Sequence, residues 1–170
     1  MIHEHCDACG FEGGSFDDNS LLKSLRDQGD LWRSMLEAAG PELRVRPEPR
    51  VWSSIEYAAH TRDILALHVY GVGQALVVDE PVFPDISGDL VDSAASTYAE
   101  SIPEEVAVEL ATNGTQLADV AERAGIDSWG RGLTIGESRS NVRQLLEHAL
   151  HDSLHHLGDV ERGLAEIRTR

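Results

Sequence analysis

The sequence predicts an all-α protein, an up-down four-helix bundle, and three observations support this. Apolar residues recur at helical spacing in four stretches, at 15–39, 54 to the mid-70s, 103–125 and from about 140 almost to the last residue. Glycine and proline interrupt that spacing between the stretches. Hydrophobic residues make up 41% of the sequence, which suffices for one compact core. A length of 170 residues is too short for two full domains.

The first two predicted helices have clear boundary signals. Gly29 weakens the middle of the first helix, and Gly40-Pro41 ends it. Three prolines within 41–50 predict an extended connection. The second helix opens with Ser53-x-x-Glu56, a capping box in which the two side chains satisfy backbone N–H groups of the first turn.

The third predicted helix follows a longer connection. Residues 81–89 predict a loop, which a short helix at about 90–100 follows. Ser101-x-Pro103-Glu104 caps the third helix, because serine accepts from the first turn and proline fits its first position. That helix is expected to end near Gly125.

Segment 127–139 predicts a loop between the third and the last helix. We expect its Trp129 to pack on the bundle. Arg131 is a candidate substrate-binding residue, because a guanidinium can clamp a carboxylate with two parallel hydrogen bonds.

The last predicted helix carries four of the eight histidines. At 100° per residue, Asp152 and His156 lie at one edge of its apolar face, whereas His148, His151 and His155 lie nearly opposite and are expected to point outward. A helix seldom places an ionisable pair at its core edge unless something satisfies both groups. Asp152 and His156, at i and i+4, are therefore candidate metal ligands.

One helix cannot supply enough ligands, and the second predicted helix offers another. His60 lies in line with Ile64 and later small and apolar residues, so it faces the core. A single histidine on an apolar face is more often a core residue than a ligand, but a second inward-facing pair favours the ligand. Asp63, one turn further on, Tyr57 and His155 are secondary candidates for supporting roles.

These motifs resemble the DinB-like superfamily of metal-binding four-helix bundles, over about residues 15–170. The resemblance rests on Trp52-Ser53, His60-x-x-Asp63 and Asp152-x-x-His155-His156. In that family one ligand comes from the second helix and two, spaced four apart, come from the last. The resemblance therefore implies His60, Asp152 and His156 as ligands of one divalent ion, although many members have histidine at the position of Asp152. Zinc is the expected ion, with nickel and iron as alternatives.

The resemblance also implies a reaction class. The superfamily includes thiol-dependent transferases and the mycothiol-dependent maleylpyruvate isomerase. It implies a low-molecular-weight thiol cosubstrate, such as mycothiol or bacillithiol, and a small electrophilic substrate. Trp129-Gly130-Arg131, then a loop and a His-rich helix, is an order similar to that of actinobacterial members.

Two other functions fit the same residues. Two histidines and one carboxylate also form the metal-binding triad of non-haem iron(II) oxygenases, which would make the protein a redox enzyme. Alternatively, the metal could tie two helices together in a binding or stress protein that has no catalytic activity.

Residues 1–14 form a separate N-terminal segment with the motif Cys6-x-x-Cys9-Gly10. Two thiolates at this spacing resemble half of a zinc ribbon, and the chain has two cysteines in all. His3, His5 or a partner subunit in a homodimer are the candidates for the missing ligands of this second metal. A free dithiol is the alternative. A redox pair or a structural disulfide is less expected, because no strand is predicted before Cys6 and cytoplasmic thiols stay reduced.

Charge and composition limit the partners. The formal net charge is −16, with 14 Lys and Arg against 30 Asp and Glu. Nucleic acids and anionic membrane surfaces are therefore disfavoured, because both attract clustered basic residues. The sequence shows no long apolar run and no signal-peptide pattern at its start, so we expect a cytoplasmic protein that acts on a small molecule.

Overall fold

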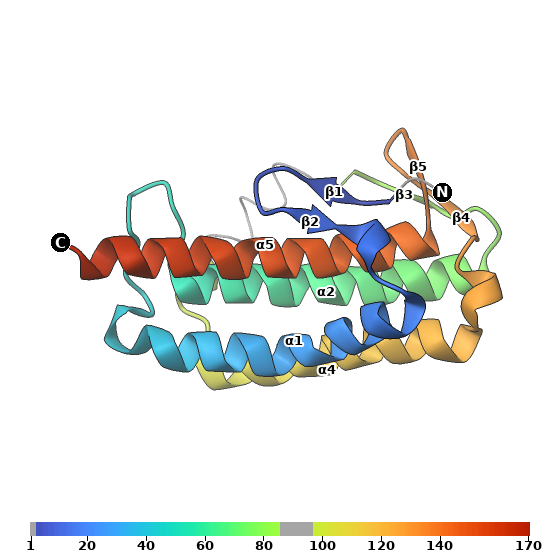
Figure 1. Ribbon diagram of the computed structural model, residues 1–170. Coiled ribbons are helices and arrows are strands. Elements are labelled where there is room, and N and C mark those ends of the chain that lie inside the picture. Colours follow the sequence, from blue (N-terminus) through green and yellow to red (C-terminus); the bar gives the residue numbers. More distant parts are fainter. Residues whose placement is uncertain (1–2, 86–96) are drawn as a thin grey trace.

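The computed structural model describes residues 3–85 and 97–170. Its body consists of four long helices (Figure 1): α1 (Asp18–Ala39), α2 (Ser54–Val77), α4 (Pro103–Ala124) and α5 (Val142–Arg168). They coincide with the four stretches of helical spacing, so the expected four-helix bundle is confirmed. The short helix expected at about 90–100 lies largely outside the described residues.

The four helices do not pack in chain order. α1 packs on α4 and α5, and α2 packs on the same two helices, so α1 and α2 are diagonal to each other. Figure 1 shows that α1 and α2 run in opposite directions, as do α4 and α5, whereas α2 and α4 run in the same direction. The alternation of an up-down bundle is thus interrupted between α2 and α4. The segment 78–102 is long enough to return along the bundle and allow this.

Polar side chains cap α2 and α5 near the expected boundaries, whereas the expected Ser101 cap of α4 is wrong, because the N-cap residue is Ile102, which makes no side-chain cap hydrogen bond. The capping box of α2 is formed, and the backbone N–H of Ser53 donates to Oε2 of Glu56 at 2.8 Å. Glu56 is buried, and Arg46 donates to it at 2.9 Å from Nε. α5 begins at Val142, where the side chain of Asn141 accepts from the backbone of the first turn.

Two glycines let α1 and α4 approach closely. A Cβ atom at Gly29 would lie 2.4 Å from the Cβ of Ala111, and one at Gly114 would lie 2.5 Å from the carbonyl oxygen of Leu25. Gly29 costs helix propensity, as expected from the sequence, but its missing side chain is what allows the two helices to pack.

The core contains one buried polar chain between α1 and α5. Nε1 of Trp32 donates to Oγ of Ser153 at 2.8 Å, and that hydroxyl donates to Oε1 of Gln28 at 2.6 Å. All three residues are fully buried. Because each of these three side chains has a hydrogen-bond partner, the hydrogen bonds fix the register of α5 against α1 without leaving unsatisfied groups. This register determines which histidines of α5 face the bundle.

Short strands and turns that were not expected from the sequence cover one side of the bundle. β1 (His5–Cys6) pairs antiparallel with β2 (Phe11–Glu12). β4 (Gly132–Ile135) pairs antiparallel with β5 (Ser138–Asn141) and parallel with β3 (Val82–Phe83). Single 3-10 turns occur at Gly13–Ser15, Gly40–Glu42 and Ile126–Ser128. The loops expected at 81–89 and 127–139 therefore contain strands.

Trp129 lies in the turn before β4 and packs into the bundle, as expected. It is 3% exposed, and its Nε1 donates to the carbonyl of Ala121 at 3.0 Å. The buried indole thereby joins this turn to the end of α4.

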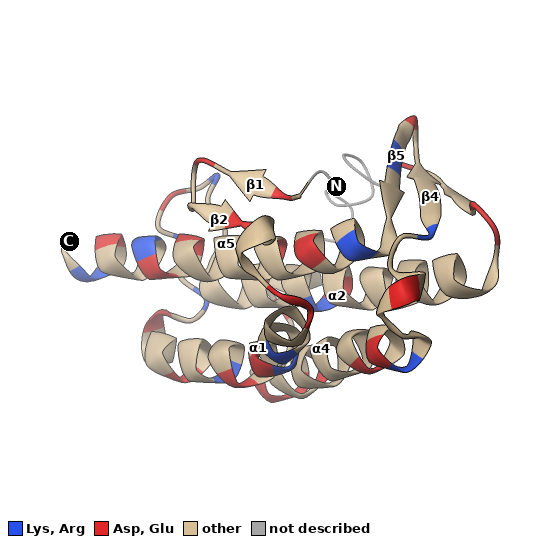
Figure 2. Cartoon of the chain, turned by 45° about the vertical axis from the view of Figure 1, so that its right-hand side comes forward, with Lys and Arg blue, Asp and Glu red and all other residues tan. Residues whose placement is uncertain are grey.

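Acidic residues are spread over the helices and loops, with fewer basic residues between them (Figure 2). The sequence has more than twice as many acidic as basic residues, which accounts for this distribution. In the described part of the chain, no helix combines the length and the apolar character that crossing a bilayer would require.

Candidate functional site

His60 of α2 and the pair Asp152 and His156 of α5 come together between the two helices. Their potential ligand atoms lie within 4.8 Å of one another. The imidazole rings of His60 and His156 are 5.1 Å apart, centre to centre. His60 is 8% exposed. The side chains of Asp152 and His156 are 19% and 18% exposed, so the group lies close to the protein surface.

Hydrogen bonds orient this group. Nδ1 of His156 lies 2.8 Å from Oδ2 of Asp159, and its Nε2 lies 3.5 Å from Oδ1 of Asp152. The other carboxylate oxygen of Asp152, Oδ2, is buried and has no hydrogen-bond partner among the described residues. A buried carboxylate oxygen without a partner is costly, so a cation at this position would relieve that cost.

The protonation of the group fits cation binding. Burial lowers the pKa of His60, which is therefore neutral near pH 7. Burial also disfavours the protonated ring of His156, but the carboxylates of Asp152 and Asp159 outweigh it and raise the pKa of His156. Burial disfavours ionised Asp152, but His156 outweighs it and lowers the pKa of Asp152. Asp152 and His156 thus favour each other's charged forms, and a metal ion could stabilise the carboxylate in place of a proton on His156.

Aromatic side chains surround the two histidines. The ring of Trp52 lies 5.1 Å from that of His60, and the ring of Tyr98 lies 6.2 Å from it. The ring of Tyr57 lies 5.0 Å from that of His156. Tyr57 was a secondary candidate and does lie at the group. Tyr98 was missed, because the short helix expected at about 90–100 carried no prediction of which of its residues face the bundle.

Asp63 is held away from the ligand group by other partners. Nε of Arg62 donates to it at 2.7 Å, and the hydroxyl of Tyr98 also bonds to it. Burial, together with the Asp63 carboxylate, raises the pKa of Tyr98 to about 12. Asp63 therefore bonds to Tyr98, a neighbour of His60, and its role as a supporting partner of a metal ligand stays a prediction.

A second group joins the N-terminal segment to α5. Cys6 and Cys9 lie beside His151 and His155, and the four ligand atoms are within 4.8 Å of one another. His151 and His155 do face away from the bundle core, but the β1–β2 hairpin covers that face. The side chains of His151 and His155 are accordingly only 14% and 28% exposed.

His3 and His5, the expected partners of the cysteines, are not brought to this group. Nδ1 of His3 lies 2.8 Å from the buried carboxylate of Glu147. His5 pairs with Asp7 at 2.9 Å and with Glu12 at 2.8 Å. His5 lies away from the sulfur of Cys6 because the two residues are neighbours in β1. Successive side chains of a strand point to opposite faces.

A third group consists of Glu4, His148 and His151. Oε1 of Glu4 lies 3.2 Å from Nδ1 of His148 and 2.9 Å from Nδ1 of His151. These are hydrogen-bond distances, and the side chain of His148 is 52% exposed. Hydrogen bonding accounts for this group without an ion.

Arg131 is not part of the metal group. Its Nε donates to the carbonyl of Ala75 at 2.7 Å, and an Nη atom donates to the carbonyl of Val78 at 3.1 Å and to Asp79 at 2.8 Å. Ala75 lies about 22 Å from His60 along α2, at 1.5 Å per residue. Arg131 therefore caps the end of α2. The structure does not bring it to the candidate metal ligands, where a substrate-binding residue was expected.

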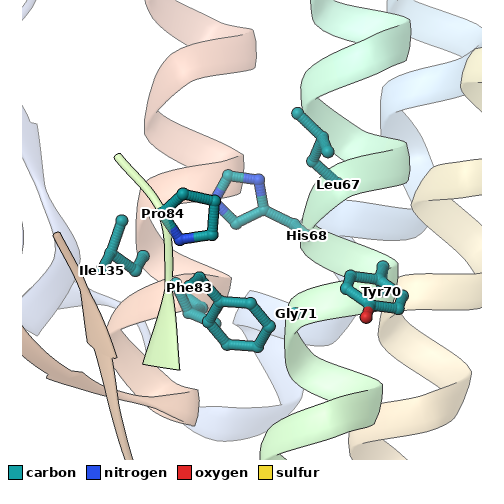
Figure 3. A pocket seen from close by; sticks show the side chains of 8 residues that line it. Leu67, His68, Tyr70, Gly71, Phe83, Pro84 and Ile135 are labelled. Atoms are coloured by element: carbon teal, nitrogen blue, oxygen red, sulfur yellow. The ribbon is translucent and has the colours of Figure 1, made fainter. Parts of the chain in front are cut away.

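A separate apolar cavity of about 210 Å³ lies where α2 meets β3 and β4 (Figure 3). Phe83, Ile135 and Tyr70 are among its lining residues. His68 also lines it, and burial lowers the pKa of His68 to about 4. His68 lies about 12 Å from His60 along α2, which is too far for contact with an ion held at His60.

Comparisons with known proteins give one informative result. No family model matches the sequence, and no curated protein matches it. The structure is similar to that of YfiT from Bacillus subtilis, with a TM-score of 0.78 and 11% sequence identity over 89% of this chain and 87% of that chain. YfiT is described as a probable metal-dependent hydrolase with an unusual four-helix bundle topology. The likeness shows a shared fold, as the DinB-like motifs led us to expect.

Proposed function

We propose that this chain, which has the four-helix fold of the DinB-like proteins, is an enzyme that uses one divalent metal ion held by His60, Asp152 and His156. The observation that carries the proposal is that ligand atoms of these three residues lie within 4.8 Å of one another, while Oδ2 of Asp152 is buried without a partner among the described residues. Three protein ligands leave coordination positions for other molecules, as catalytic metal sites do. The donor set suits zinc, with nickel and iron as alternatives.

The surrounding residues have definite roles in this proposal. When bound, a divalent ion would lower the pKa of a coordinated thiol or water and so supply a nucleophile near neutral pH. Asp159 holds the ring of His156 so that Nε2 faces Asp152 and could bind the ion. Trp52, Tyr57 and Tyr98 limit the access of water to the group.

The reaction that we favour is the transfer of a low-molecular-weight thiol, such as mycothiol or bacillithiol, to a small electrophile, or an isomerisation that such a thiol assists. The resemblance of the motifs supports this choice. Hydrolysis is the second candidate, because the structurally similar YfiT is described as a probable metal-dependent hydrolase. In the first reaction the attacking atom is sulfur, and in the second it is the oxygen of water.

Cobalt spectroscopy in a cysteine-free background tests thiol binding. The variant Cys6→Ser, Cys9→Ser has no cysteine left, so any thiolate–cobalt charge-transfer absorption must come from an added thiol. We expect that absorption when mycothiol or bacillithiol is added to the cobalt-loaded variant, and its loss when His60→Ala is added. Absence of the absorption at saturating thiol would overturn thiol transfer. Metal-dependent cleavage of an ester or amide panel without thiol would then support hydrolysis.

Removing the metal tests whether the site is catalytic at all. We expect the stripped protein to keep its helices and lose its activity, because the bundle has its own apolar core. If the helices instead unfold without metal, the ion serves structure, and the protein is a metal-binding protein rather than an enzyme. Activity that depends on Fe²⁺ and O₂ would indicate the oxygenase alternative.

A further inference from the structure

The N-terminal hairpin presents its two cysteines in a tight turn whose backbone amides face the sulfur atoms. The backbone amides of Cys9 and Ala8 lower the pKa of Cys6, whereas burial raises the pKa of Cys9. Gly10 closes the turn: its φ is +74°, and its N–H donates to the carbonyl of Cys6 at 2.8 Å. Amides in this arrangement stabilise thiolates, the form in which cysteine binds metals.

Two histidines of α5 meet the hairpin. Nδ1 of His151 lies 2.9 Å from Oε1 of Glu4, while its Nε2 is buried and has no hydrogen-bond partner among the described residues. Nδ1 of His155 lies 3.8 Å from the sulfur of Cys6. A buried ring nitrogen without a partner costs free energy, and an ion beside it would remove that cost. A carboxylate on the other nitrogen is what orients many metal-binding histidines.

We propose that Cys6, Cys9, His151 and His155 bind one zinc ion that fastens the N-terminal hairpin to α5. The four donor atoms are within 4.8 Å of one another. Tetrahedral zinc places sulfur and nitrogen ligands about 3.6 Å apart, so binding needs the donors to move by about 1 Å or less. All four ligands come from one chain, so a partner subunit is not needed to complete the shell.

This second ion differs in role from the ion of the proposed function. Two thiolates and two imidazoles fill a tetrahedral shell and leave no position for a substrate, which is the mark of a structural zinc site. This zinc site does not depend on the proposed function. The cysteine group, which is Cys6, Cys9, His151 and His155, shares no residue with the three proposed ligands between α2 and α5.

The hairpin needs such a fastening because it is too small to be stable alone. Its strands have two residues each, and isolated hairpins are marginal even when longer. Phe11 stacks on His151 at 5.1 Å between ring centres, and the N–H of Glu4 donates to the buried Glu147 at 2.9 Å. These contacts hold the hairpin over α5, and the ion adds a link at the turn.

A reactive thiol is the alternative for the same residues. Cys6 and His155 alone could form a thiolate–imidazole pair of the kind that cysteine nucleophiles use. That pair would not explain why Cys9 and the buried Nε2 of His151 lie beside it. One ion explains the positions of all four donors. Zinc binding is therefore the proposal that the geometry favours.

Titration of the stripped, reduced full-length protein with Co²⁺ tests the proposal directly. Thiolate ligands give cobalt an intense near-ultraviolet absorption. The bundle group, which is His60, Asp152 and His156, contains no sulfur. We expect this absorption to be saturated when two equivalents of Co²⁺ fill both proposed sites, and Zn²⁺ to abolish it by displacement. The variant Cys6→Ser, Cys9→Ser should lose the absorption together with one equivalent of bound metal. His151→Ala and His155→Ala should each weaken this binding by more than about 100-fold, which exceeds the effect of losing an outer hydrogen bond.

Two kinds of control variant keep the test decisive if His151→Ala or His155→Ala folds poorly. His5→Ala changes the residue next to Cys6 and should leave the absorption unchanged. His155→Cys replaces one ligand by another and should make it more intense. The proposal would be overturned by no sulfur–cobalt absorption in the reduced protein, by unchanged affinity in both alanine variants, or by loss of the absorption in His5→Ala. A Cys6–Cys9 disulfide that forms equally fast with and without Zn²⁺ would also overturn it.

Discussion

Nδ1 of His156 lies 2.8 Å from Oδ2 of Asp159, and this contact turns the other ring nitrogen toward Asp152. The same oxygen of Asp159 lies 3.7 Å from Nε2 of His155. One carboxylate thus contacts two consecutive histidines, of which one belongs to the bundle group and the other to the cysteine group. Asp159 is therefore the link between the two candidate metal sites.

Removal of the Asp159 charge should weaken metal binding at the bundle site. We expect Asp159→Asn to lower zinc affinity there by about 10- to 100-fold, because the carboxylate orients His156 and raises its basicity. The measurement is a competitive zinc titration in the Cys6→Ser, Cys9→Ser background. Glu161→Gln removes a charge from an exposed position nearby and should change nothing. Equal affinities for the two variants would show that Asp159 has no part in binding.

Metal removal should loosen the N-terminal hairpin and leave the bundle intact. Amide hydrogen exchange of residues 4–12 is expected to accelerate in the stripped protein, because β1 and β2 have only two residues each and few backbone hydrogen bonds between them. Amides in the middle of α1 and α4 should stay protected, because these helices pack through a buried core. Comparison of exchange with and without Zn²⁺ checks this. Uniform loss of protection would mean that the metals hold the whole fold together.

The buried carboxylate of Glu147 should make stability depend on acid. Burial disfavours its ionised form, but hydrogen bonds from Arg143, Glu4 and His3 outweigh this and lower the pKa of Glu147. A lowered native pKa contributes stability above the unfolded value of about 4.3, and this contribution is lost as the pH falls through the native value.

Glu147→Gln isolates this effect. We expect the free energy of unfolding at pH 7 to fall by about 1–3 kcal/mol, because a buried Arg143 loses its charged partner. The variant should also lose less stability than the unaltered protein between pH 5 and lower values. Urea unfolding at a series of pH values measures both. An identical acid dependence in the two proteins would contradict this assignment.

Arg131 should act on stability and not on the metal. Arg131→Ala removes the hydrogen bonds to the carbonyls at the end of α2. We expect the free energy of unfolding to fall by about 0.5–1.5 kcal/mol. Thermal unfolding measures the loss, and zinc affinity should not change. Arg139→Ala, an exposed position in β5, is the control. A raised KM for a carboxylate-bearing substrate would instead restore the role expected from the sequence.

The long helices could be predicted because each repeats its apolar spacing over many turns and has a recognisable start, such as Ser53 and Glu56. The strands could not, because two to four residues carry no detectable period. The packing order also escaped prediction. Helical spacing shows which face is buried but not which neighbour buries it, so the parallel arrangement of α2 and α4 has no local signal.

The bundle group was predictable because His60, Asp152 and His156 each combine a polar side chain with an inward helix position. The wheel correctly placed His151 and His155 on the outer face, but a wheel cannot show that another segment covers that face. His5 was wrongly expected beside the cysteines, because the two-residue strand His5–Cys6 has no signal in the sequence, and adjacent residues of a strand point to opposite faces.

Anomalous diffraction at the zinc edge from crystals of the zinc-loaded protein tests the central claim most directly. We predict a peak between α2 and α5 that lies about 2.0–2.2 Å from Nε2 of His156 and from donor atoms of His60 and Asp152. Crystals of Asp152→Asn should lack that peak. A fully zinc-loaded protein with no peak at these three residues would contradict the claim that the bundle holds a metal ion there.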